Sequence, residues 1–209
     1  MPTWRARFFL FSLVWLLTIA GGLIGLARYE QDAGSIGKTP AQWPAPPGIA
    51  LDPSRPTLLM FAHPKCPCTR ASMEELNRLL ARSLGMVTPH VVFFKPEKDV
   101  GDWAGGALWE SAKAIPSVIV DTDTDGAKAR LFGAETSGYV VVYDPHCKLL
   151  FHGGITAGRG HAGDNAGESA ILSLLTTHDT TAVGESRVFG CALLNPHQPS
   201  PVQVTACTK

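Results

Sequence analysis

The chain has no excess of charge of either sign, and it has little cysteine. Eighteen Lys and Arg residues balance eighteen Asp and Glu residues, so the formal net charge is zero, and no basic tract occurs. Nucleic-acid binding, which needs a basic patch or stripe, therefore has no support. Five cysteines among 209 residues are too few for a disulfide scaffold, and they lack the paired spacing of a structural zinc site. No glycine-rich loop ends in Gly-Lys-Ser/Thr, which argues against a phosphate-binding loop.

A long apolar run, Phe8–Leu26, carries no charge. A helix of about 20 apolar residues spans a bilayer. Arg5 and Arg7 precede the run and no positive excess follows it, so the positive-inside rule puts the N-terminus in the cytoplasm and the rest of the chain in the periplasm or outside the cell. The alternative is a cleaved signal peptide, but the run is long for one and no clean cleavage site follows. We expect residues 1–28 to be a single-pass anchor in the inner (cytoplasmic) membrane.

Three further regions follow this anchor. Residues 29–56 are rich in Pro, Gly and Ala and are typical of a linker. Residues 57–177 alternate between strand and helix patterns, and residues 178–209 form an irregular C-terminal extension. The predicted strands are Thr57–Ala62, His90–Phe94, Ile115–Val120, Tyr139–Tyr143 and Lys148–His152, and the predicted helices are Thr69–Ser83, Trp103–Ala114, Gly126–Phe132 and Glu168–Leu175. Alternation followed by a hairpin and a helix predicts a three-layer α/β domain with a mixed sheet.

The most informative motif is Cys66, Pro67 and Cys68, between the first predicted strand and the helix after it. Proline suits the first helical position and biases the residue before it towards an extended backbone. We therefore expect Cys66 at the N-cap and Cys68 in the first turn. Unpaired N–H groups and the helix dipole favour a thiolate there. A thiolate is a nucleophile or a ligand for a soft metal.

A strand that ends in a near-adjacent cysteine pair, a helix, and later a strand, hairpin and helix resemble the thioredoxin superfamily over Pro56–Leu175. The likeness is closer to its membrane-tethered branch of TlpA-type and AhpC/TSA-type proteins. The segments Phe61–Arg70, Phe132–Gly138 and Gly153–Asn165 also resemble bacterial proteins labelled RedB. The resemblance implies a thioredoxin-like α/β/α fold with a redox-active centre.

Two departures from that family bear on the chemistry. The family usually has two residues between its cysteines, and here only Pro67 intervenes. It also usually has a cis-proline that keeps metal off the cysteines, but Thr136 and Ser137 occupy that place, which makes metal binding more credible. His63 stands where a peroxiredoxin has Thr or Ser, so peroxidase activity is disfavoured.

The first hypothesis is a membrane-anchored thiol–disulfide oxidoreductase. Cys66 is the nucleophile and Cys68 the resolving thiol, with His63, Pro67, Thr136 and Ser137 in support. A disulfide between these two cysteines would close a strained ring and act as a labile oxidant or isomerase rather than a durable crosslink. No cofactor is required, and the partners are other thiol or disulfide redox proteins.

The second hypothesis is a non-enzymatic copper-binding or copper-delivery protein. Cys66 and Cys68 would bind Cu(I) with one histidine, because two thiolates and one imidazole satisfy that ion. His161 is the preferred third ligand, and His63 and His152 are alternatives. Sco-type copper chaperones, which are also tethered and thioredoxin-like, use two cysteines and a distant histidine. The partner would then be a cuproprotein.

The other cysteines leave two possibilities open. Cys191 and Cys207 could form a disulfide with each other, which is slightly favoured because free thiols outside the cytoplasm tend to oxidise. Alternatively, Cys191 could fold back on Cys66 as a third redox thiol. Cys147 lies in a predicted hairpin turn and has no expected role.

Overall fold

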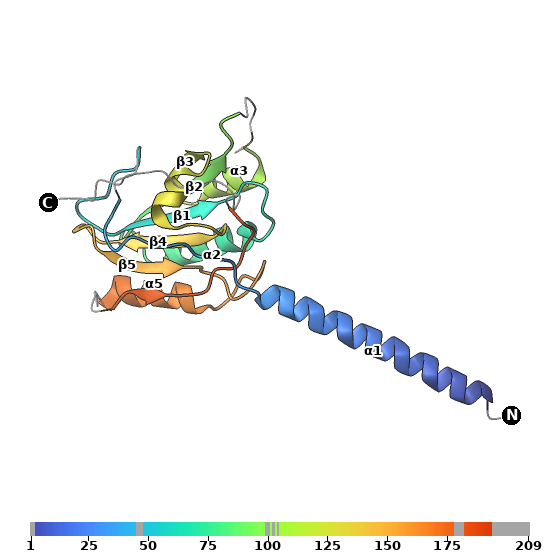
Figure 1. Ribbon diagram of the computed structural model, residues 1–209. Coiled ribbons are helices and arrows are strands. Elements are labelled where there is room, and N and C mark those ends of the chain that lie inside the picture. Colours follow the sequence, from blue (N-terminus) through green and yellow to red (C-terminus); the bar gives the residue numbers. More distant parts are fainter. Residues whose placement is uncertain are drawn as a thin grey trace. The chain divides into compact units, whose positions relative to one another are not determined.

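The structure is a computed structural model that describes residues 3–44, 48–98, 101, 103, 105–177 and 182–193. The chain divides into two compact units, residues 1–32 and 33–209. The first unit is one continuous helix, α1 (Thr3–Gln31), drawn in blue in Figure 1. Its segment Trp4–Gln31 is long and apolar enough to cross a membrane. The helix extends past both ends of the predicted span because the flanking residues contain no proline that would end it.

The second unit is built on a six-stranded sheet (Figure 1) with the strand order β3-β2-β1-β4-β5-β6. The strands are β1 (Thr57–Ala62), β2 (Thr88–Lys95), β3 (Ile119–Thr124), β4 (Tyr139–Tyr143), β5 (Leu149–Gly153) and β6 (Gly184–Glu185). Strand β1 is parallel to β2 and antiparallel to β4, so the sheet is mixed as predicted. The central strands β1 and β4 are buried along their whole length, as expected for near-continuous apolar runs covered on both faces.

Three helices pack on one face of the sheet. They are α2 (Thr69–Arg82), α3 (Ala107–Ala114) and α5 (Ala166–Thr177). In α2 the buried apolar side chains recur at helical spacing, as Met73, Leu76, Leu79 and Leu80, and this stripe turns towards the sheet. Together with side chains from the alternate positions of the strands they form one hydrophobic core.

The opposite face is covered by one short helix and by extended chain. The helix is α4 (Ala127–Phe132), which ends at Gly133 as its C-cap in the left-handed conformation. Trp43 packs edge-on against Phe132 and Tyr143, so residues before the first strand belong to this second core.

The segment 33–44 is therefore not the free linker that the sequence predicts. Its backbone bonds to the domain at several points, including Gly37 N–H to Gly133 O at 2.9 Å and Trp43 N–H to Cys147 O at 2.8 Å. Tyr143 donates its hydroxyl hydrogen to Pro40 O at 2.7 Å. The Pro and Gly content that suggested a linker instead provides an extended backbone that fits closely over the sheet.

One predicted strand was wrong in position. The structure places β3 at Ile119–Thr124 rather than at Ile115–Val120. Ile115 is the buried C-cap of α3, and a turn with Ser117 at a φ of 68° follows it. Strand β3 is an edge strand with a largely exposed, acid-containing sequence, and Asp123 accepts bonds from the first N–H groups of α4. It therefore lacks the apolar run that marks a buried strand.

The C-terminal extension is also more ordered than predicted. Residues 182–193 are described, and they add β6 beside β5. Val188, Phe189 and Leu193 are buried, so this stretch is part of the domain.

Candidate active site

The Cys-Pro-Cys motif lies in the short connection between β1 and α2. The helix begins at Thr69 with Cys68 as its N-cap, so the expectation of Cys66 at the N-cap was wrong by two residues. The physical reason is a tight turn before the helix, in which Thr69 N–H bonds to Cys66 O at 3.2 Å and Arg70 N–H to Pro67 O at 3.4 Å. Pro67 needs no N–H in this turn, which agrees with its supporting role.

A third thiol reaches the motif from the far end of the sequence. The sulfur of Cys191 lies 3.0 Å from the sulfur of Cys66, and the Cys191 N–H points at the same sulfur, 3.4 Å away. Cys66, Cys68 and Cys191 are all free cysteines. We call these three residues the thiol cluster.

The slightly favoured disulfide between Cys191 and Cys207 does not agree with this arrangement. Cys191 is a free thiol held against Cys66, because its backbone pairs with the chain beside β4. Cys207 lies outside the described residues. Cys147, for which no role was expected, is disulfide-bonded.

The three thiols differ in acidity. Burial alone would raise the pKa of Cys66, but hydrogen bonds from Cys191 and Thr69 outweigh it, and the pKa is lowered. Burial, and then the nearby charge of Cys66, raises the pKa of Cys68. Burial, followed by the hydrogen bond to Cys66, raises the pKa of Cys191 to about 12. Cys66 is thus the most acidic thiol of the cluster, and a hydrogen bond joins its sulfur to the sulfur of Cys191.

Ser137 lies beside the thiol cluster, and Thr136 precedes it in the chain. The Ser137 hydroxyl accepts a bond from the His63 N–H at 2.7 Å and lies 2.7 Å from the Thr69 hydroxyl. The Ser137 N–H donates to Cys191 O at 2.9 Å. Ser137 therefore connects the loop after β1, the start of α2 and the C-terminal segment. Thr136 turns its hydroxyl to Ser35 O at 2.8 Å, away from this junction.

The His63 ring, which was expected to support the cysteines, is surrounded by aromatic side chains. It stacks on Phe94, with the centroids 5.8 Å apart, and meets the edge of Trp103. Its Nδ1 accepts the Lys65 N–H at 3.2 Å, and burial and the charge of Lys65 lower its pKa. In the part of the chain that the structure describes, no hydrogen bond joins this ring to a thiol. His63 contributes through its backbone, by which it binds Ser137.

The preferred metal-ligand set is not assembled. Within the described ranges, no group of three His, Cys, Asp or Glu side chains is placed to hold a metal ion. His161 lies exposed in a tight turn that pairs with Gly158. His161 belongs to the glycine-rich loop, residues 153–167, and its role as a third metal ligand stays a prediction.

Two residues of the site were not singled out from the sequence. Thr69 supplies hydrogen bonds that lower the pKa of Cys66, and Arg159 donates from Nη1 to Gly190 O at 2.5 Å. The positive charge of Arg159 also opposes the rise in the pKa of Cys68 and Cys191. Thr69 directly follows the motif, and its position was the available signal. Arg159 comes from the glycine-rich loop, and no pattern in the sequence distinguished it from its neighbours.

No protein-family model matches the chain, and no curated protein matches it. Several solved structures do match the chain. An uncharacterized conserved protein from Geobacillus kaustophilus is 16% identical with a TM-score of 0.61, over 80% of this chain and 98% of that one. A hypothetical protein from Sinorhizobium meliloti 1021 is 18% identical with a TM-score of 0.51, over 80% and 99% of the two chains. A Mycobacterium tuberculosis DsbF structure in mixed oxidized and reduced forms is 19% identical with a TM-score of 0.40, over 59% and 80%.

The chain has the thioredoxin-like fold that the sequence predicts. A parallel unit of β1, α2 and β2 is joined to an antiparallel hairpin of β4 and β5, which α5 follows. The order and direction of these elements carry this conclusion. The narrower resemblance to the TlpA branch or to RedB proteins stays a prediction.

Proposed function

We propose that the chain is a membrane-anchored thiol–disulfide oxidoreductase whose nucleophile is Cys66. One observation carries the proposal: the free thiols of Cys66 and Cys191 meet 3.0 Å apart beside the start of α2, and of the three free thiols only Cys66 has a lowered pKa. A lowered pKa places more of this sulfur in the thiolate form, which is the form that attacks a disulfide. Its neighbours stay protonated as resolving thiols.

The proposed reaction has two steps. The Cys66 thiolate attacks one sulfur of a partner disulfide, forms a mixed disulfide, and releases the other sulfur of the partner as a thiolate. A second thiol of the chain, for which the motif itself offers Cys68, attacks the Cys66 sulfur and releases the remaining partner thiol. Two electrons pass to the partner, and another redox protein returns them by the same chemistry in reverse. No cofactor takes part.

The proposed location is the inner membrane, with the domain facing the periplasm or the cell exterior. The support is helix α1, which is long and apolar enough to span a bilayer, and the pair Arg5 and Arg7 near its start, before the apolar run, which favours a cytoplasmic N-terminus. A compartment outside the cytoplasm allows disulfides to form and persist, which suits the disulfide at Cys147.

The test uses the full chain in detergent. The protein is equilibrated in glutathione buffers of graded potential, its free thiols are counted by alkylation, and its reduction of insulin is measured. We expect a reversible two-electron transition, and a loss of at least about a hundredfold in insulin reduction in Cys66→Ser, because the nucleophile is gone. Glu74→Gln, at an exposed position of the same helix, is the control. A wild-type protein with no thiol transition contradicts the proposal.

The copper alternative is decided on the same reduced sample. Cu(I) is offered under anaerobic conditions, and bound metal is counted after gel filtration. Stoichiometric copper that is lost in both Cys66→Ser and Cys68→Ser, together with no insulin reduction, would replace the oxidoreductase proposal by copper binding or delivery to a cuproprotein.

A further inference from the structure

The C-terminal segment that carries Cys191 is bonded along its length to the active-site side of the domain. We call residues 186–193 the strap. Cys191 O accepts from Ser137 N–H at 2.9 Å, Leu193 N–H donates to Glu135 O at 2.7 Å, and Ala192 forms an antiparallel bridge with Thr136. The strap thus pairs with the chain before β4 in the manner of a short added strand, and its register places the Cys191 side chain over Cys66.

The geometry of the two sulfurs suits a disulfide. They lie 3.0 Å apart, and a covalent S–S bond of about 2.05 Å needs an approach of only about 1 Å. The two cysteines are 125 positions apart in the sequence, so their disulfide closes no small ring. A bond between Cys66 and Cys68, in contrast, must close its ring across Pro67 alone, which strains the bond and makes it more easily reduced.

The strap also controls access to the nucleophile. The Cys66 side chain is only 1% exposed, whereas Cys68 and Cys191 are partly exposed. Gly190 lies directly on Ser137, where a Cβ atom would collide with the Ser137 carbonyl oxygen. A partner disulfide therefore reaches Cys66 only when the strap has moved.

We propose that Cys191 is the thiol that resolves the mixed disulfide on Cys66, and that the oxidised protein carries a Cys66–Cys191 disulfide that fixes the strap in place. This inference rests on the proposed thiol–disulfide exchange. After Cys66 has formed a disulfide with the partner, the Cys191 sulfur attacks the Cys66 sulfur. The bond from Cys66 to the partner breaks, the Cys66–Cys191 bond forms, and the partner leaves as a thiol with the proton from Cys191. Two protein thiols are oxidised and one partner disulfide is reduced.

The experiment maps the disulfide of the oxidised protein. The full chain in detergent is oxidised with glutathione disulfide, free thiols are alkylated, and the protein is digested and analysed by mass spectrometry. Three forms are compared: wild type, Cys68→Ser and Cys191→Ser. We expect the Cys66–Cys191 peptide pair in wild type and in Cys68→Ser. In Cys191→Ser we expect a glutathione adduct on Cys66 whose lifetime is at least about tenfold longer, because its resolving thiol is missing. Cys191→Ala repeats the test without a hydroxyl at the site.

The outcomes separate this inference from the function on which it rests. A Cys66–Cys68 or Cys68–Cys191 bond in wild type, or an adduct lifetime that only Cys68→Ser prolongs, overturns the role of Cys191 and leaves the oxidoreductase proposal standing. No disulfide and no glutathione adduct at Cys66 in any form overturns both.

Discussion

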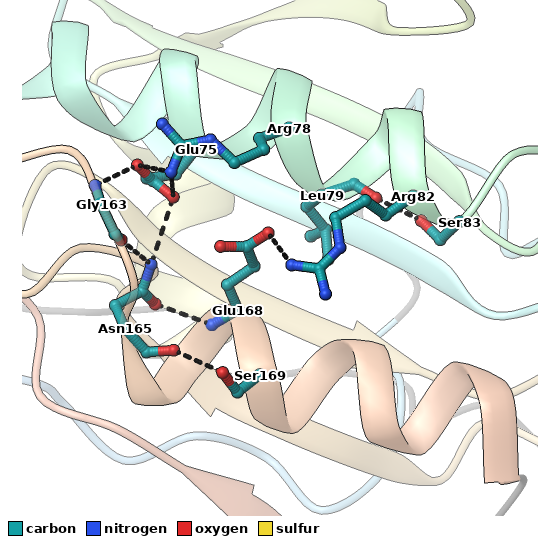
Figure 2. A network of polar contacts seen from close by, with 9 residues as sticks. All are labelled: Glu75, Arg78, Leu79, Arg82, Ser83, Gly163, Asn165, Glu168 and Ser169. Carbon is teal, nitrogen blue, oxygen red and sulfur yellow. Dashed lines mark hydrogen bonds and ion pairs between the residues drawn. The ribbon is translucent and has the colours of Figure 1, made fainter.

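Two sites beside α2 hold buried ionisable groups, and they differ in the partners that these groups have. At the start of α2, the thiol cluster lowers the pKa of the Cys66 thiol, and the less acidic thiol of Cys191 lies 3.0 Å away. Further along, Glu75 and Glu168 are buried between α2 and α5, and Figure 2 shows their bonds, which we call the carboxylate network. Glu75 accepts from Gly163 N–H at 2.6 Å and from the Asn165 amide at 3.3 Å, and it pairs with Arg78 at 3.2 Å.

The partners of a buried ionisable group distinguish a structural role from a reactive one. The oxygens of Glu75 are saturated by donors from an arginine, an amide and the backbone (Figure 2), so the side chain ties the glycine-rich loop to α2. Glu168 has Arg82 as its partner at 3.2 Å. In the thiol cluster the main partner of the Cys66 sulfur is a second thiol, carried by a segment that backbone bonds hold at the edge of the domain. A buried group whose hydrogen-bonding capacity is fully satisfied adds to stability, whereas a buried group beside a partner that can itself react is a candidate for chemistry.

The largest expected effect is on the carboxylate network. Glu75→Ala should lower the free energy of unfolding by about 2–4 kcal/mol, because it leaves buried donors of Gly163 and Asn165 without an acceptor. Urea unfolding of the full chain in detergent, followed by tryptophan fluorescence, measures it. The neighbouring exposed Glu74→Ala is the matched control and should change the free energy by less than about 0.5 kcal/mol. Equal effects of the two substitutions would show that the network has no structural role.

The next largest expected effect is on how readily Cys66 is alkylated when the strap is altered. Gly190→Ala should raise the rate at which iodoacetamide alkylates Cys66 by about tenfold, because overpacking against Ser137 costs about 1–3 kcal/mol and favours the lifted strap. Ala192→Ser, an exposed position on the same strap, is the control and should leave the rate unchanged. An unchanged rate in Gly190→Ala would mean that the strap does not cover the nucleophile.

The smallest effect is a pH dependence. Burial, and then the neighbouring Glu75, raises the pKa of Glu168 above its ordinary value of 4.5. The folded state therefore binds this proton more tightly than the unfolded state, so the contribution is present at low pH and is lost as the pH rises through the folded pKa. Between about pH 4.5 and about pH 7 the urea midpoint should fall less in Glu168→Gln than in wild type. The same fall in both proteins would contradict the assignment.

Elements with strong local patterns were predictable from the sequence. The runs that became β1, β4 and α2 have clear local patterns, and the Cys-Pro-Cys motif between β1 and α2 marked the candidate site. Strand β3 was misplaced because its edge position leaves it exposed and without an apolar pattern. Elements that depend on long-range pairing had no local signal: Trp43 packs on the far face of the sheet, and Cys191 meets Cys66 only through the strap.

The carboxylate network shows the same limit. Glu75 lies between Met73 and Leu76 on the buried stripe of α2, where a charged residue breaks the expected apolar pattern. That break was visible in the sequence, but its partners were not, because Gly163 and Asn165 come from a loop about 90 positions away. A charged residue within an apolar helical stripe indicates a distant partner without telling which one.

The connection between α1 and the domain is short. Helix α1 ends at Gln31, and Gly34 N–H is already bonded to Val188 O of the strap at 2.8 Å. Two intervening residues span about 10 Å of fully extended chain, so the helix and the strap are joined by a short covalent path. A force along α1 would therefore act directly on the segment that carries Cys191.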